Sequence, residues 1–158
     1  MAHITIEYMI LIPILILQIF LLPYATGIFM NYWSTSSDTL ALNDASIHLG
    51  SSIEQLYFFL NNPSVSSGTI TNSLGVSPYI GNYAYKGNAT LISVSGSGSE
   101  KVLKLTLSLM GSTISITSPV TLGQNTQWVN STFMSNSTSA CISGYKDSSN
   151  TIWLSFST

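Results

Sequence analysis

The titratable and nucleophilic side chains of this sequence are few, and they are widely separated along the chain. The two histidines are His3 and His48, and Cys141 is the only cysteine. The carboxylates Asp44 and Glu54 lie ten residues apart. Metal binding and acid–base or nucleophilic catalysis both require such groups to converge on one point. No spacing in the sequence brings them together, so we expect neither an enzyme nor a protein with a metal ion or cofactor.

The composition excludes several classes of partner. Charged residues make up 6% of the chain, Arg is absent, and Ser and Thr together number 44. Four lysines and a formal net charge of -2 provide no basic patch for nucleic acid or for an anionic membrane surface. A single cysteine excludes an intramolecular disulfide, and we expect Cys141 to be a small buried apolar side chain. The length of 158 residues suits one globular domain with an extended segment.

Glu7 precedes the longest apolar run of the sequence. Residues 8–33 include no charged residue, and residues 9–22 are apolar except for Gln18. A helix needs about 20 such residues to cross a bilayer core of about 30 Å. No Lys or Arg precedes the run, unlike in a secretory signal peptide, so a retained membrane segment is favoured. Because an unpaired buried carboxylate is costly, we expect Glu7 either at the hydrated membrane interface or paired with the α-amino group of a neighbouring helix.

The start of the chain carries a more specific pattern. The segment Ala2-His3-Ile4-Thr5-Ile6-Glu7-Tyr8 resembles the prepilin pattern, in which a small residue precedes the cut and glutamate is fifth in the mature chain. Pro13 follows Glu7 by six residues, as in the start of TadE-like pilins, and archaeal pilins with class III signal peptides begin similarly. Over residues 1–30 the sequence therefore resembles the type IV pilin-like superfamily.

This resemblance implies specific events at the N-terminus. A prepilin peptidase would cut between Ala2 and His3, which leaves residues 1–2 as a residual leader, and Glu7 would take part in assembly. Such precursors usually carry Lys or Arg before the cut, whereas only Met1 and Ala2 stand there in this sequence. The alternatives are an unusually short leader, cleavage at another position, or no cleavage.

The helix pattern changes after residue 33. The Ser, Thr and Asp residues at 34–38 favour a restart of the helix or a soft joint, because these types cap helices. Pro63 predicts a helix end at Asn61 or Asn62. Within the apolar part, Pro13 and Pro23 are expected to kink or locally open the helix. One amphipathic stripe at spacings of three and four residues is formed by Leu42, Ala45, Leu49, Ile53, Leu56 and Leu60.

The remaining residues show short runs of strand-forming residues between Gly, Ser and Asn. These runs predict antiparallel strands at 79–85, 89–94, 102–110, 113–118, 127–133, 140–145 and 151–156. Alternation places Leu103, Leu105, Leu107 and Leu109 on one core-facing side of a strand, and Gly111 begins a hairpin turn.

These patterns together predict an α+β fold. A hydrophobic membrane or filament-core helix occupies residues 3–33, and its amphipathic continuation occupies residues 34–62. Residues 63–158 form a Ser/Thr-rich head, which we predict to be an antiparallel β-sandwich-like domain or an open barrel.

Three N-glycosylation acceptor patterns occur in this head, at Asn88, Asn130 and Asn136. With eleven Asn and 44 Ser or Thr residues, chance alone produces about three such patterns, so their number carries no weight. If the head is exported, the three asparagines are candidate glycan sites.

The resemblance implies a structural subunit, a major pilin, of an extracellular type IV pilus-like filament. Such a subunit resides in the cytoplasmic membrane before assembly, meets an assembly machinery there, and forms a helical homo-oligomer through its apolar helix. Adhesion or cell–cell contact is the implied role, and the class III-like start favours an archaeal source. The alternatives are a membrane-tethered monomeric surface binding module, and a minor pilin or pseudopilin of a secretion or DNA-uptake machine.

Overall fold

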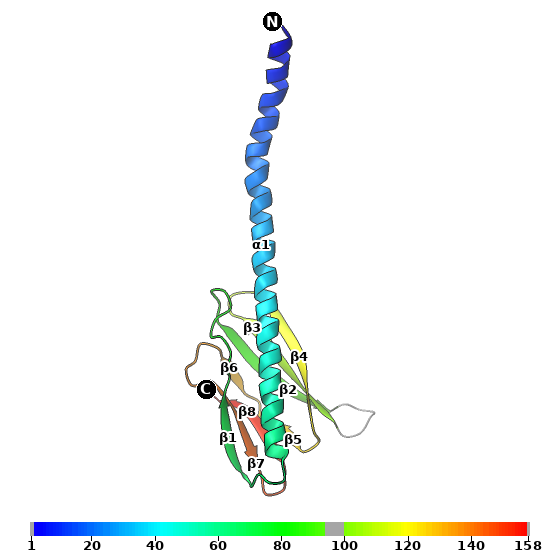
Figure 1. Ribbon diagram of the computed structural model, residues 1–158, viewed down its shortest axis with the longest axis vertical. Helices are drawn as coiled ribbons and strands as arrows, with labels where there is room; N and C mark the ends of the chain where they lie inside the picture. The colour runs from blue at the N-terminus through cyan, green and yellow to red at the C-terminus, as the bar shows by residue number, and fades with distance from the viewer. Residues whose placement is uncertain (1, 94–99, 158) are drawn as a thin grey trace. The chain divides into compact units, whose positions relative to one another are not determined.

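A computed structural model describes residues 2–93 and 100–157, and among these it describes side chains from residue 9 onward. The described residues form one helix and eight strands, shown in Figure 1: α1 (Ala2–Asn61), β1 (Gly68–Ser73), β2 (Tyr85–Ser93), β3 (Lys101–Leu109), β4 (Ser115–Leu122), β5 (Thr126–Trp128), β6 (Thr132–Met134), β7 (Cys141–Lys146) and β8 (Ile152–Ser157). The predicted α+β fold is confirmed. A long N-terminal helix precedes two mainly antiparallel sheets, and the described strands close no barrel.

The chain divides into two compact units, Met1–Ser37 and Asp38–Thr158. The first unit consists of the apolar part of α1. Pro13 and Pro23 lie inside α1, which continues past both of them. The predicted restart at residues 34–38 is wrong, because these residues are helical. Instead of capping a new helix, the Thr35 hydroxyl donates a hydrogen bond of 2.9 Å to the carbonyl of Asn31 one turn earlier.

The helical part of the second unit supplies one wall of its hydrophobic core. Of the predicted stripe, Ala45 is partly buried, and the other members are at most 6% exposed. Tyr57 and Ser46 are also buried, and the Ser46 and Ser118 hydroxyls are hydrogen-bonded to each other. The helix ends at Asn61, as predicted.

A buried lysine completes the end of α1. The Lys146 ammonium donates hydrogen bonds of 2.9 and 3.0 Å to the carbonyls of Asn62 and Val65. These carbonyls follow the helix, where backbone acceptors lack intrahelical partners. Lys146 is only 6% exposed, so the contacts also supply partners for its charge.

The strands form two four-stranded sheets with the orders β1-β7-β8-β5 and β4-β3-β2-β6. The predicted hairpin is confirmed, since β3 and β4 pair antiparallel around a turn in which Gly111 has a φ of 82°. The four predicted core leucines of β3 are at most 3% exposed. One pairing departs from the antiparallel prediction, because β5 and β8 run parallel.

Three strand predictions are corrected by the structure. Residues 79–84 lie outside the named strands and make one isolated bridge, between Ile80 and Tyr83. The predicted strand at 127–133 is split into β5 and β6, which belong to different sheets. Between them, the Ser131 hydroxyl donates to the carbonyl of Val129 and accepts from the amide of Phe156, which satisfies backbone groups that a continuous strand would pair. The strand β1 was not predicted, because its polar residues give little alternation.

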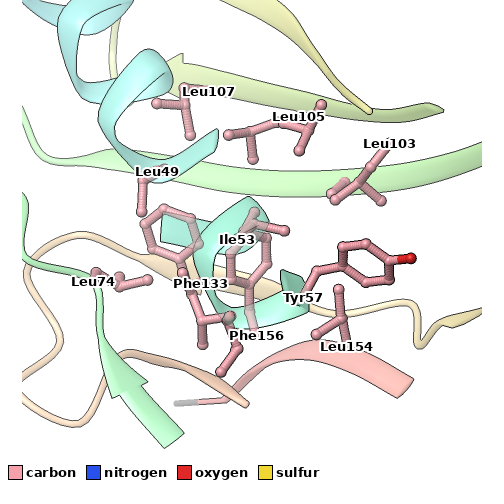
Figure 2. Packing of buried hydrophobic residues seen from close by; sticks show 14 of the residues in the cluster. Leu49, Ile53, Tyr57, Leu74, Leu103, Leu105, Leu107, Phe133, Leu154 and Phe156 are labelled. Atoms are coloured by element: carbon pink, nitrogen blue, oxygen red, sulfur yellow. The ribbon is translucent and has the colours of Figure 1, made fainter. Parts of the chain in front are cut away.

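The core of the second unit lies where α1 meets residues of both sheets. Figure 2 shows Ile53 of α1 between Leu105 of β3 and Phe156 of β8. Phe133 stacks edge-on against Phe156 with ring centroids 4.7 Å apart. A Cβ atom at Gly87 would lie 2.1 Å from the Phe133 ring, so only glycine fits at that position of β2.

Cys141 is less buried than its residue type suggests. It is partly exposed, because strand alternation places it on the same side of β7 as Ser143 and Tyr145, away from the core residue Ile142.

Candidate assembly surface

The large apolar residues of the first unit are exposed throughout the part of that unit whose side chains are described. Every large hydrophobic side chain from residue 9 to residue 33 is at least 49% exposed, and Trp33 reaches 78%. The helix is long and apolar enough to cross a membrane, by length and composition. Monomeric soluble proteins rarely expose contiguous apolar patches of this size. A long apolar N-terminal helix of this kind indicates membrane association or a signal sequence.

The exposed segment is apolar on every side, unlike the amphipathic part of α1. The first charged residue after Tyr8 is Asp38, at the start of the second unit. A helix that is hydrophobic all round is stable when lipid or other helices surround it. Lipid or other helices would therefore suit this segment as surroundings.

Two shallow apolar grooves lie on this segment. The first, which we call the Pro13 groove, is lined by Pro13, Ile16, Leu17, Phe20, Leu21 and Tyr24. The second, the Trp33 groove, is lined by Thr26, Phe29, Met30, Trp33 and Ser34. At about 100° of rotation per residue, the two sets of residues face directions roughly 140° apart. The grooves therefore offer two different sides of the helix to neighbouring side chains.

Aromatic side chains gather in the last turns of the apolar segment. Tyr24, Phe29, Tyr32 and Trp33 are each at least 73% exposed. Tyr and Trp favour the boundary between lipid and water, because their rings are apolar and carry one polar group. The cluster is therefore suited to a membrane interface at this end of the segment.

The residues predicted to act at the N-terminus are placed only by their backbone. Ala2, His3 and Glu7 belong to α1, but their side chains lie outside the described residues. Cleavage between Ala2 and His3 and the pairing of Glu7 with an amine stay predictions. Of the other residues predicted to act in assembly, Pro13 lines the first groove and Pro23 lies within α1.

The structure brings two of the three candidate glycan sites together. Asn88 is exposed on β2 and lies opposite Thr132 of β6, which belongs to the acceptor pattern of Asn130. The two patterns line one polar hollow, formed by Asn88, Ala89, Thr90, Asn130, Ser131 and Thr132. Asn136 is exposed in the segment after β6. Nothing in the sequence indicated that Asn88 and Asn130 are neighbours, because the pairing of β2 with β6 joins residues far apart in the chain.

Two titratable groups of the head make contacts that shift their pKa values. Burial raises the pKa of Tyr85 to about 12, and its hydroxyl donates a hydrogen bond of 2.8 Å to the carbonyl of Ser77. The backbone amide of Ser148, followed by the hydroxyls of Ser149 and Ser148, lowers the pKa of Asp147. Among the described residues, no three His, Cys, Asp or Glu side chains lie together as metal ligands.

Models of known protein families, characterised proteins and solved structures were compared with this chain, and none of them matches it. Its relationship to known proteins therefore depends on the architecture and on the N-terminal pattern. The chain has a long apolar N-terminal helix followed by a β-sheet head, an architecture compatible with that of a pilin.

Proposed function

We propose that this chain is the structural subunit of an extracellular type IV pilus-like filament, assembled by side-by-side packing of its N-terminal helices. The observation that carries the proposal is the exposed segment from residue 9 to residue 33, which is apolar on every side and grooved on two sides. Lipid can cover such a segment, but grooves on two sides also suit a helix that packs against more than one neighbouring helix.

The apolar area provides enough free energy for stable assembly. The segment exposes eighteen large hydrophobic side chains. Full burial of one such side chain contributes roughly 1.5–3 kcal/mol relative to water, so partial burial of the set amounts to tens of kcal/mol before association costs. Once the subunit leaves the membrane, dissociation into water is therefore strongly unfavourable.

The second unit is suited to the outside of such a filament. It has its own hydrophobic core, to which α1 from Leu42 to Leu60 contributes, and its surface carries many hydroxyl and amide groups. In this proposal a prepilin peptidase cuts after Ala2, and an assembly machinery adds the subunit to the filament from the membrane. The N-terminal resemblance supports these partners, and it also supports adhesion or cell–cell contact as the role.

A second candidate function is a monomeric surface binding module tethered by an uncleaved helix. The aromatic cluster from Tyr24 to Trp33 favours it, because a permanent anchor also needs an interface belt. The two candidates differ in whether α1 has protein neighbours.

Electron microscopy of filaments sheared from cells that express the chain tests the proposal, together with N-terminal sequencing of the dominant band. We expect filaments made mainly of this chain, and a sequence that begins at His3. Absence of the chain from every filament, while it is present in the membrane, would contradict assembly and support the tethered module. Its presence at a low ratio to another subunit would instead indicate a minor pilin.

A further inference from the structure

The outward face of the sheet β1-β7-β8-β5 carries two exposed aromatic rings side by side. Tyr145 of β7 lies directly opposite Trp153 of β8, and their side chains are 43% and 41% exposed. Thr69 of β1 lies opposite Tyr145, and Gln127 of β5 lies opposite Trp153. These four residues, which we call the aromatic row, cross the whole sheet. The row therefore combines two flat apolar surfaces with a hydrogen-bonding side chain at each end.

The aromatic row lies on an uncharged surface. The other outward residues of the four strands are Thr71, Ser73, Cys141, Ser143, Ser155 and Ser157, all of them small and neutral. Lys146, next to Tyr145 in the chain, points the other way and is buried. Asp147 lies beyond the strand, and its carboxylate accepts hydrogen bonds from Ser148 and Ser149. The opposite sheet differs, since its exposed residues include Lys86 and Lys104.

We propose that the aromatic row binds an uncharged carbohydrate. The C–H groups of a sugar ring can pack on an aromatic face, and its hydroxyls can exchange hydrogen bonds with Thr, Ser and Gln side chains. The outward residues of the four strands carry no charge, and Asp147 just beyond β7 is a carboxylate, so charge complementarity disfavours an anionic ligand. Tyr145 and Trp153 are the stacking residues, and Thr69 and Gln127 are the hydrogen-bonding residues.

The available area fits a small ligand better than a second copy of the chain. Aromatic side chains bury about 150–250 Å² when fully covered, so two rings exposed by less than half offer on the order of 100 Å² each. A stable protein interface needs roughly 800 Å² from each partner, with a well-packed apolar centre. The rest of this face offers mainly small hydroxyl side chains. The exposed aromatic area of this face therefore fits a ligand of one to three sugar rings.

This inference concerns the head alone and does not depend on filament assembly. The full chain can be tested in micelles of lauryldimethylamine oxide, a detergent without a sugar headgroup that would compete. Isothermal titration calorimetry then measures binding of neutral oligomers of β-1,4-glucose, β-1,4-N-acetylglucosamine and α-mannose, with oligogalacturonate as the acidic comparison. We expect binding of at least one neutral oligomer and no preference for the acidic one.

The variants locate the site. Trp153→Ala and Tyr145→Ala should each weaken binding at least about tenfold, whereas Trp153→Phe should retain part of the affinity because a ring remains. Gln127→Ala should weaken binding by a smaller factor. The matched control is Tyr83→Ala, which removes a tyrosine of the same 43% exposure outside this sheet and should leave binding unchanged.

Several outcomes would overturn the proposal. They are failure of every neutral oligomer to bind the wild-type chain, tighter binding of the acidic oligomer, or equal affinity of the wild type and Trp153→Ala. If Trp153→Ala does not fold, Trp153→Phe and Gln127→Ala still decide, because both should bind more weakly than the Tyr83→Ala control. Carbohydrate binding without filaments would contradict the proposed function alone, and filaments without carbohydrate binding would contradict this inference alone.

Discussion

Glu7 is the residue on which the choice between a filament subunit and a lone anchor depends most directly. In an assembly, its carboxylate would leave water and would need the amino group of a neighbouring helix. In a lone anchor it would stay hydrated at the membrane surface and would contribute little. Replacement of Glu7 should therefore impair a filament subunit and leave a tethered module unaffected.

Replacement of Glu7 by Ala should reduce the yield of sheared filaments at least about tenfold, because an amine at the filament core would lose its partner. The measurement is the ratio of filament-bound to membrane-bound chain on immunoblots. Glu54→Ala, which removes a carboxylate in the second unit, is the control and should leave the ratio unchanged. An unchanged ratio for Glu7→Ala would instead support the tethered module.

Tyr85 predicts a pH dependence of head stability. Burial raises its pKa to about 12 in the folded chain, above the usual value near 10 in the unfolded chain. The unfolded chain therefore releases the Tyr85 proton at a lower pH than the folded chain does. The contribution of the neutral Tyr85 phenol to the free energy of unfolding is fully present below about pH 10 and is lost as the pH rises towards 12. Denaturant unfolding measured between pH 8 and pH 12 should show this loss.

Tyr85→Phe should lower the free energy of unfolding at pH 8 by about 0.5–1.5 kcal/mol, because the hydrogen bond to Ser77 is lost. It should also weaken the decline in stability at alkaline pH. Tyr83→Phe is the control, since Tyr83 is exposed and its replacement should change neither quantity. An identical alkaline decline in the Tyr85→Phe variant would show that Tyr85 is not its source.

At the scale of elements, one helix serves two environments. The part from Leu42 to Leu60 presents a buried stripe to both sheets, whereas the part from residue 9 to residue 33 has no covering element among the described residues. The end of α1 is held by β7 through Lys146, which joins the helix terminus to the first sheet. Lys146 contacts Asn62, which lies 84 residues earlier in the sequence.

Lys146→Met should destabilise the head by about 1–3 kcal/mol, because the carbonyls of Asn62 and Val65 would lose their shared donor. Methionine retains most of the aliphatic part of the lysine side chain, so the loss of stability measures the contribution of the two ammonium hydrogen bonds. Lys104→Met is the control, since Lys104 is exposed on β3, and its effect should stay within about 0.5 kcal/mol. Chemical denaturation of both variants measures the difference, and equal effects would contradict a capping role for Lys146.

At the scale of the whole molecule, we expect the two units to differ in their tendency to self-associate in water. The hydrophobic core cluster lies entirely within Asp38–Thr158, and the largest run of exposed apolar side chains lies within Met1–Ser37. The first unit should therefore cause self-association, and the second should fold without it.

A chain of residues 38–158 should be a folded monomer in buffer, whereas the full chain should require detergent. Size-exclusion chromatography gives the oligomeric state, and circular dichroism gives a cooperative thermal transition if the core is intact. A variant of the full chain with Tyr83→Ala serves as the control for handling and should still require detergent. Aggregation of residues 38–158 would contradict the independence of the second unit.

Much of the architecture was predictable from local patterns. The apolar run, the stripe from Leu42 to Leu60 and the alternating leucines of β3 follow from residue spacing, because helix and strand periodicities place such residues on defined sides. The end of the helix at Asn61 follows from Pro63 in the same way. The three candidate glycan sites and the roles of Glu7, Pro13 and Pro23 in assembly stay predictions from the sequence.

Only the tertiary structure decided which distant segments meet. The polar strand β1, the division of residues 127–133 between two sheets and the parallel pairing of β5 with β8 leave no local signal, because backbone hydrogen bonds to distant strands determine them. The same holds for the aromatic row, since Tyr145 and Trp153 become neighbours of Thr69 and Gln127 only through strand register. The sequence by itself determined that an apolar helix carries a β head, because burial periodicity is local. The surfaces that this head presents depend on long-range pairing, which only the folded chain defines.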